Sequence, residues 1–239
     1  MNKLILTFGA GVAILLPLAS SVAQEMVRLV THQSYPFHYT ENDVIKGNVI
    51  GELKCAFNRL GLPYRVEMSQ QWRNNLLLQD GKVDGLVTTV SNKSNADYGQ
   101  SSKVISIKKA LWFNIGAPLN INNQTAEYKK FAVAAIFGSE EWYSLKKEGY
   151  NISFQPRNAT ELIQLLLANK VDAIVSTQAV VDKSLRQNQN VGVNLSHTEY
   201  KAFGLKLHFS NDFIHSSPNF LAKFDYAIDN CILTSSGEQ

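Results

Sequence analysis

The sequence predicts an α/β protein of two similar lobes, because one block occurs twice. Three leucines, a turn residue, Lys-Val-Asp and a short apolar run stand at 76–88 and again at 165–176. In each copy helical spacing leads into the leucines, and Gly81 or Asn169 stands where a helix ends in the left-handed conformation. The apolar run that follows suits a strand buried on both faces. The copies start 89 positions apart, too far for a solenoid repeat.

Hydroxyl residues end both copies and indicate a binding site. Thr88 and Thr89 follow the first apolar run, and Ser176 and Thr177 follow the second. Ligands of open α/β sheets bind beyond the carboxyl ends of the strands. We therefore expect these four side chains to face a shared cleft.

Residues 1–23 read as a secretory signal peptide. Lys3 precedes an apolar run at 4–16, after which come Pro17 and small residues up to Ala23. The run is shorter than the ~18 residues that a membrane helix needs, and we place cleavage after Ala23. An uncleaved anchor is the alternative. The mature chain is then expected in the periplasm.

Composition narrows the function further. The formal net charge is only +3 and the basic residues are scattered, so binding to nucleic acid or to a membrane surface is not indicated. Cys55 and Cys231 are the only cysteines, and an exported protein can join them in a disulfide. The bridge requires the predicted helix at 49–60 and the C-terminal helix to lie side by side, and the spacing leaves this open.

The first part of the chain alternates strands and helices. We expect strands at 28–31, 64–67 and 109–115, a helix at 49–60 that ends at Gly61, and a second helix opened by Gln70-Gln71-Trp72. The loop after the first strand contains Tyr35 and Phe37. These aromatic residues and Trp72 could stack on a ligand or could pack in the core. Lys93 is the one cation near the strand end at Thr88.

The second part repeats this order and then returns. We expect strands at 131–136, 152–154, 173–176 and 202–209, helices at 139–147, 158–167 and 178–186, and a terminal helix from 217. Ser139 is expected as a helix N-cap. The chain thus leaves the first lobe near residue 115 and returns near 200, crossing twice as in a hinge. We assign 24–115 with 198–239 to lobe 1 and 116–197 to lobe 2.

The sequence lacks the common catalytic patterns. It has no phosphate loop, dinucleotide glycine pattern, paired-cysteine metal spacing or serine-hydrolase elbow. The five histidines share no ligand-like spacing, so neither a metal site nor a cofactor is predicted. This favours binding over catalysis.

The order of several motifs resembles the bacterial extracellular solute-binding proteins of family 3. The motifs are the signal peptide, Tyr35-Pro36-Phe37, Gly47 before a helix that ends Arg59-Leu60-Gly61, Gly81-Lys82-Val83-Asp84, Gly138-Ser139, Val171-Asp172-Ala173 and Phe203-Gly204-Leu205. The resemblance implies a type II periplasmic binding protein fold with a two-stranded hinge. It further implies a monomer, not an enzyme, that captures a small polar, amino-acid-like solute and delivers it to the membrane permease of an ABC importer.

The resemblance also implies site residues. The solute would stack on Tyr35 and Trp72, and its carboxylate would meet hydroxyls at Thr88, Thr89 and Ser91. Lys93 stands near the place of a carboxylate-binding arginine, Ser139 and Glu140 match contact positions in lobe 2, and Thr177 replaces an aspartate that holds an amino group. Because both ionic partners differ, we expect stacking and neutral hydrogen bonds to dominate.

Two alternatives stay open within the same resemblance. It also covers periplasmic enzymes such as cyclohexadienyl dehydratases, for which Lys93 and Glu140 are the acid/base candidates in this sequence. A sensory protein that presents the solute to a membrane receptor is the other alternative. The sequence does not identify the solute.

Overall fold

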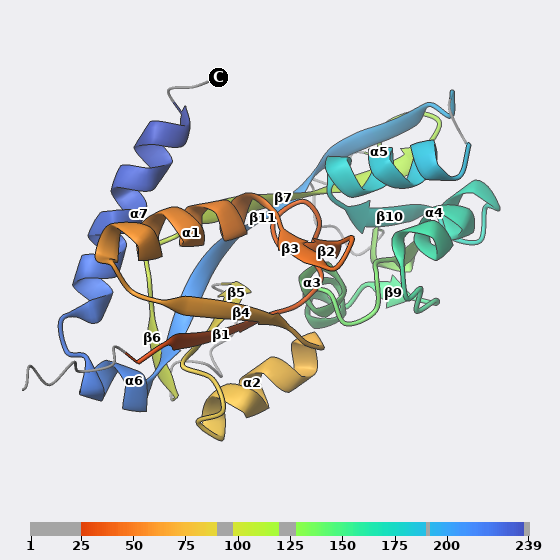
Figure 1. The fold of residues 1–239 in the computed structure, drawn as a ribbon. Coiled ribbons are helices and arrows are strands. Elements are labelled where there is room, and N and C mark those ends of the chain that lie inside the picture. The colour runs from red at the N-terminus through yellow and green to blue at the C-terminus, as the bar shows by residue number, and fades with distance from the viewer. Residues whose placement is uncertain (1–24, 90–97, 120–127, 190–191, 237–239) are drawn as a thin grey trace, which may run out of the picture.

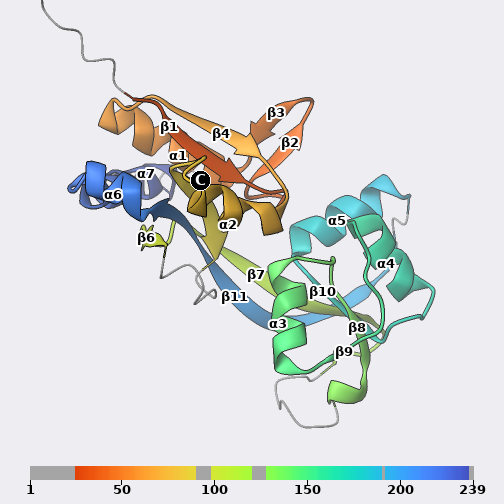
Figure 2. The same ribbon diagram turned by 90° about the horizontal axis from the view of Figure 1, so that it is seen from below.

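The computed structural model describes residues 25–89, 98–119, 128–189 and 192–236, and within them the chain forms two α/β lobes (Figures 1 and 2). The predicted signal peptide lies outside the described residues. The main sheet has the strand order β4-β1-β5-β11-β7-β10-β8-β9, with β6 paired to β11. The sheet is therefore continuous from one lobe to the other. The two-lobed fold class is confirmed, and the exact lobe boundaries stay a prediction.

The first lobe contains the strands β1 (Val27–Thr31), β4 (Tyr64–Met68), β5 (Gly85–Thr89) and β6 (Gly99–Ser101), the hairpin β2 (Tyr39–Glu41) and β3 (Val44–Lys46), and the helices α1 (Asn48–Leu60), α2 (Gln71–Gln79), α6 (Asn211–Ser216) and α7 (Phe220–Ser236). The second contains the strands β8 (Ala132–Ala134), β9 (Asn151–Ile152) and β10 (Ala173–Ser176), a short 3-10 helix (Tyr128–Lys130), and the helices α3 (Glu140–Glu148), α4 (Ala159–Leu167) and α5 (Gln178–Gln187).

Two long strands join the lobes. β7 (Ser106–Ile115) and β11 (Leu195–Ser210) pair antiparallel along most of their length, with a register shift between Glu199 and Lys201. β11 also pairs with β5 in the first lobe, and β7 pairs with β10 in the second. Figure 2 shows these two strands running between the lobes. They form the predicted two-stranded connection.

The repeated block has the same structure in both lobes. Gly81 and Asn169 have positive φ angles of 64° and 52°, and each ends the hydrogen bonding of its helix as predicted. Asp84 Oδ2 accepts a hydrogen bond of 2.7 Å from the backbone N–H of Arg28, which lies on the adjacent strand β1. Asp172 Oδ2 accepts from the N–H of Ala132 on β8, also at 2.7 Å. The aspartate of each Lys-Val-Asp motif thus fixes a neighbouring strand.

Each lobe has its own hydrophobic core. In the first lobe, α1 and α7 pack on one face of the sheet, and the rings of Phe57 and Phe224 lie 5.5 Å apart in this core. In the second lobe, Trp112 and Trp142 belong to a cluster on one side of the sheet, and Ile174 belongs to a cluster with α4 on the other. The buried apolar run of each repeated block is therefore part of a core.

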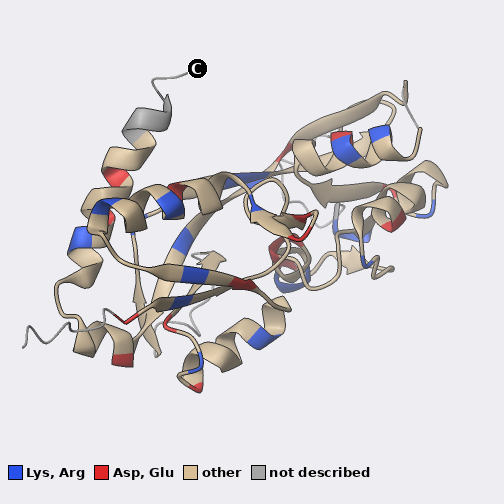
Figure 3. Cartoon of the chain, in the orientation of Figure 1, with Lys and Arg blue, Asp and Glu red and all other residues tan. Residues whose placement is uncertain are grey.

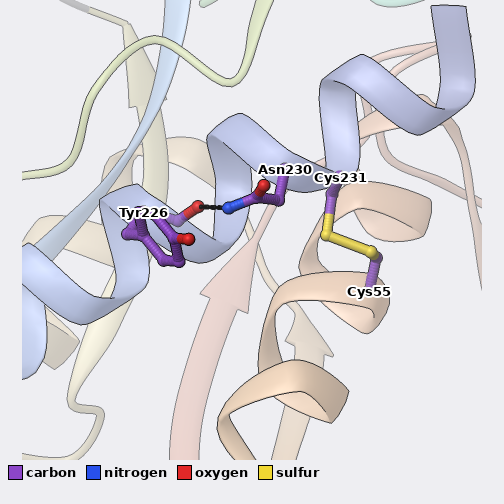
Figure 4. Close-up of a disulfide and its surroundings, with 4 residues drawn as sticks. All are labelled: Cys55, Tyr226, Asn230 and Cys231. Carbon is purple, nitrogen blue, oxygen red and sulfur yellow. Dashed lines mark hydrogen bonds between the residues drawn. A yellow bond between two sulfur atoms is a disulfide. The ribbon is translucent and has the colours of Figure 1, made fainter.

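Cys55 on α1 and Cys231 on α7 form a disulfide, so the pairing that the sequence left open is present (Figure 4). Their Cα atoms lie 6.0 Å apart, within the usual range for a bridge. Cys231 is buried in the core of the first lobe, and Cys55 packs at its edge. The bridge joins two helices that are 176 positions apart in the sequence.

Charged residues are spread over both lobes (Figure 3). Among the described residues, no helix is both long enough and apolar enough to cross a membrane. No group of three or more His, Cys, Asp or Glu side chains in the described ranges is arranged to hold a metal ion.

Candidate functional site

A cleft of about 640 Å³ lies between the lobes. The first lobe contributes the loop after β1, from His32 to Tyr35, and the start of α2 at Gln71 and Trp72. The second lobe contributes the residues at the starts of α3, α4 and α5. Lys108 on the connecting strand β7 also lines it. The cleft is thus lined from both lobes and from the strand that joins them.

Three N-capped helices begin at the second-lobe wall. The side chain of Ser139 accepts from the N–H of Trp142 at α3, and Asn158 accepts from the N–H of Glu161 at α4. Thr177 Oγ1 accepts from the N–H of Val180 at α5 over 3.3 Å. Capping uses an acceptor of each hydroxyl, so Ser139 and Thr177 keep their hydroxyl protons for other partners.

A buried ion cluster lies against this wall. Lys108 Nζ is 2.6 Å from Glu140 Oε2 and 2.9 Å from Glu141 Oε1, and the three side chains are 4%, 7% and 7% exposed. Burial alone would raise the pKa of Glu140, but the Lys108 ammonium holds this pKa well below its usual value. Burial would likewise lower the pKa of Lys108, but the two carboxylates raise it above its usual value. Both groups are therefore charged at neutral pH.

First-lobe side chains reach Glu140 across the cleft. Gln71 Nε2 donates to Glu140 Oε1 at 3.2 Å, and His32 Nε2 lies 3.5 Å from the same oxygen. Behind His32, His38 is fully buried, and its Nδ1 lies 2.9 Å from Thr31 Oγ1 and 2.6 Å from the carbonyl oxygen of His32. Burial lowers the pKa of His38 to about 3, so its imidazole is neutral. These contacts connect α3 to the loop after β1.

Aromatic and cationic side chains also line the cleft. Trp72 is 67% exposed, and Phe137 and Tyr143 from the second lobe are about half exposed. The ammonium of Lys183 on α5 lies 4.2 Å from the centre of the Tyr35 ring. Arg157 lies beside the loop before α3, because Phe137 N donates to the carbonyl oxygen of Pro156 at 2.8 Å.

The structure brings together six of the eleven site residues suggested by the sequence. The cleft lining includes Tyr35, Trp72, Ser139, Glu140, Ser176 and Thr177. Phe37 is buried in the first-lobe core, and Thr88 and Thr89 lie in β5, which pairs with β11. None of these three is among the described residues that line the cleft. Ser91 and Lys93 lie outside the described residues.

Sequence reasoning missed Lys108, His32, Arg157 and Lys183. Lys108 carried a usable signal, because side chains alternate along a strand and the large residue Trp112 must face the core. Counting back from Trp112 places Ala110 and Lys108 on that same face, and all three are buried. A lysine at an inward position requires a buried anionic partner.

Comparisons by sequence gave no match: no protein-family model matches the chain, and no curated protein matches it significantly. Solved structures do match. A histidine kinase sensor domain, described as similar to periplasmic binding proteins, has a TM-score of 0.70 with 16% identity over 90% of this chain and 92% of that one. The arginine-, lysine- and histidine-binding protein ArtJ from Geobacillus stearothermophilus has a TM-score of 0.65 with 18% identity over 89% and 91%.

A third match is the ancestral amino-acid-binding protein AncCDT-1, a precursor of cyclohexadienyl dehydratase. Its TM-score is 0.64, with 16% identity over 86% of this chain and 88% of that one. At such identities the likeness concerns the fold. The chain has the type II periplasmic binding protein fold that its motifs predicted.

Proposed function

We propose that this protein captures a small polar solute in the cleft between its two lobes. The observation that carries the proposal is the cleft itself, lined from both lobes by exposed aromatic rings and by polar groups at three helix starts. Its volume of about 640 Å³ suits a small metabolite. A solute that touches both lobes favours their closure, because it binds the closed arrangement better than the open one.

We further propose that the chain is exported by the segment at 1–23, acts in the periplasm and delivers its solute to an ABC importer. Support comes from the resemblance to family 3 and from the likeness to proteins named as amino-acid-binding. A sensory role is the second candidate, supported by the likeness to a histidine kinase sensor domain. Co-purification from membranes with a permease or with a receptor separates the two.

Binding is a better proposal than catalysis on the same cleft. A general acid or base works best when its pKa lies near the working pH. Glu140 and Lys108 hold each other in their charged forms, with the pKa of the first lowered and that of the second raised. Neither exchanges a proton readily at neutral pH. Turnover of prephenate-like substrates by the purified protein would overturn this argument.

A thermal-unfolding screen over amino acids, polyamines, organic acids and sugars tests the proposed function. A solute at a hundred times its dissociation constant adds about 2.7 kcal/mol to the free energy of unfolding. Trp72→Ala should weaken binding of the identified solute about tenfold, because the variant removes a stacking surface. Tyr226→Ala is the matched control, since Tyr226 is 73% exposed and lies on α7, away from the cleft. Equal affinity in both variants would contradict the assignment of Trp72 to the site.

A further inference from the structure

Five side chains form one corner of the cleft, which we name the charged corner: His32, Gln71, Lys108, Glu140 and Glu141. Its charges do not balance. One ammonium faces two carboxylates, and all three side chains are more than nine-tenths buried. These three side chains therefore carry one negative charge in excess, and burying an uncompensated charge is costly. The start of α3, where both glutamates lie, offsets only part of that cost.

The neighbours of Glu140 on the first-lobe side are weak or neutral donors. Gln71 supplies one amide hydrogen bond of 3.2 Å. His32 Nε2 lies 3.5 Å away, too far for a good hydrogen bond. His32 is only 8% exposed, and its Nδ1 has no hydrogen-bond partner among the described residues. A buried imidazole that points at a carboxylate without a firm bond on either nitrogen leaves a place for a further hydrogen-bonding group.

The other cations of the cleft do not fill this place. Lys183 lies over the Tyr35 ring and 3.9 Å from Glu41. Arg157 is exposed to solvent. Within the described ranges, no ion pair joins either of them to Glu140 or Glu141. The missing positive charge is thus not supplied by the described part of the chain.

We propose that the charged corner binds a protonated amine of the solute. The ammonium donates one hydrogen bond to Glu140 Oε1, where Gln71 now donates, and lies beside His32 Nε2, which is 3.5 Å from the same oxygen. Its charge completes the cluster of one lysine and two glutamates. This inference rests on the proposed function and names the chemical class of its solute. It also assigns the cationic group to Glu140 at the start of α3 instead of to the uncharged Thr177.

Isothermal titration of the mature protein with matched probe pairs tests the inference. Putrescine with 1,4-butanediol and alanine with lactate each compare an amine with an analogue that has none. Lysine with norleucine compares two amino acids that differ in the side-chain amine alone. We expect the amine to bind about ten to a hundred times more tightly than its analogue in at least one pair, as for a charge-assisted hydrogen bond. Glu140→Gln should abolish most of that preference.

The variants are chosen to keep the fold. Glu140→Gln is isosteric and leaves Lys108 paired with Glu141 at 2.9 Å, so the remaining cluster is neutral. Glu67→Gln is the control, because Glu67 lies on β4 outside the cleft lining and its side chain is 58% exposed. An unchanged preference in Glu140→Gln, or equal binding of both members of every pair by the wild type, overturns the inference.

Other outcomes separate this inference from the proposed function. If sugars or organic acids bind in the cleft while no amine does, the solute-binding function stands and the ammonium site is wrong. If neutral solutes bind with uptake of one proton, measured from the heat in buffers of different ionisation enthalpy, a group of the protein supplies the missing charge and the inference also fails. If no solute of any class binds, both are wrong.

Discussion

Replacing Lys108 by methionine should destabilise the protein strongly. At an effective dielectric constant of about 20, each of its two ion pairs, at 2.6 and 2.9 Å, represents roughly 6 kcal/mol of gross attraction. Desolvation of the buried ammonium cancels much of this attraction. Removing one partner of a buried cluster nevertheless typically costs about 3 to 5 kcal/mol, because the remaining charges stay uncompensated. We expect this loss in the free energy of unfolding of Lys108→Met at pH 7.

The contribution of Glu140 to the pH dependence of stability should change sign as well. In the wild type the pKa of Glu140 is lowered on folding, so its contribution is present above the unfolded value of about 4.3 and is lost as the pH falls through the folded value. Without Lys108, burial raises the pKa of Glu140 instead. The difference in stability between the variant and the wild type should therefore shrink when the pH is lowered from 7 to 5. The wild type should gain nothing from Glu140 over that interval.

Urea denaturation between pH 5 and pH 8 measures both effects. Lys109→Met is the control, because Lys109 is the next residue on β7 and is exposed to solvent. The triple variant Lys108→Met, Glu140→Gln, Glu141→Gln removes all three charges and should recover most of the stability, even if Lys108→Met alone does not fold. A loss below about 1 kcal/mol in Lys108→Met, or a triple variant no more stable than it, would refute the reasoning.

Three further outcomes follow from the structure. The double variant Cys55→Ser, Cys231→Ser should lose about 2 to 5 kcal/mol of unfolding free energy, measured by urea denaturation, because the unfolded chain is no longer closed into a loop of 176 positions. Reduction of the wild-type disulfide should give the same loss. Phe224→Ala, at a fully buried ring, should cost about 3 to 5 kcal/mol in the same assay. Burial lowers the pKa of His38 on folding to about 3, so the wild type should lose about 1.2 kcal/mol of unfolding free energy between pH 6 and pH 5. The pH profile of His38→Gln should lack this loss.

The fold was predictable because its signals are local. The Lys-Val-Asp blocks combine a helix stop, a buried strand and an aspartate within a dozen residues, and each of these depends on near neighbours. The β2–β3 hairpin was missed, although Asn42 and Asp43 have the positive φ angles of 51° and 60° that its turn requires. Asn-Asp is a weaker turn signal than Asn-Gly.

The site was only partly predictable, because its partners come from distant segments. Ser139 and Thr177 were recognisable as residues at helix starts and strand ends, which is where a cleft forms in this kind of fold. The pairing of Lys108 with Glu140 and Glu141 joins a connecting strand to a helix of the second lobe. No spacing rule relates such segments. Their contact follows only from the way β7 passes beneath α3.

Two groups of contacts cross the cleft, and a solute has to exchange with them. Lys183 lies over Tyr35 at 4.2 Å, and Gln71 donates to Glu140 at 3.2 Å. A solute that stacks on Tyr35 displaces the first contact, which is worth about 0.5 to 1 kcal/mol because Lys183 is one-third exposed. An amine that binds Glu140 replaces the second. These contacts compete directly with the solute, which lowers its affinity. The same contacts also hold the two lobes together in the closed arrangement that the solute needs, which reduces the free-energy cost of closure.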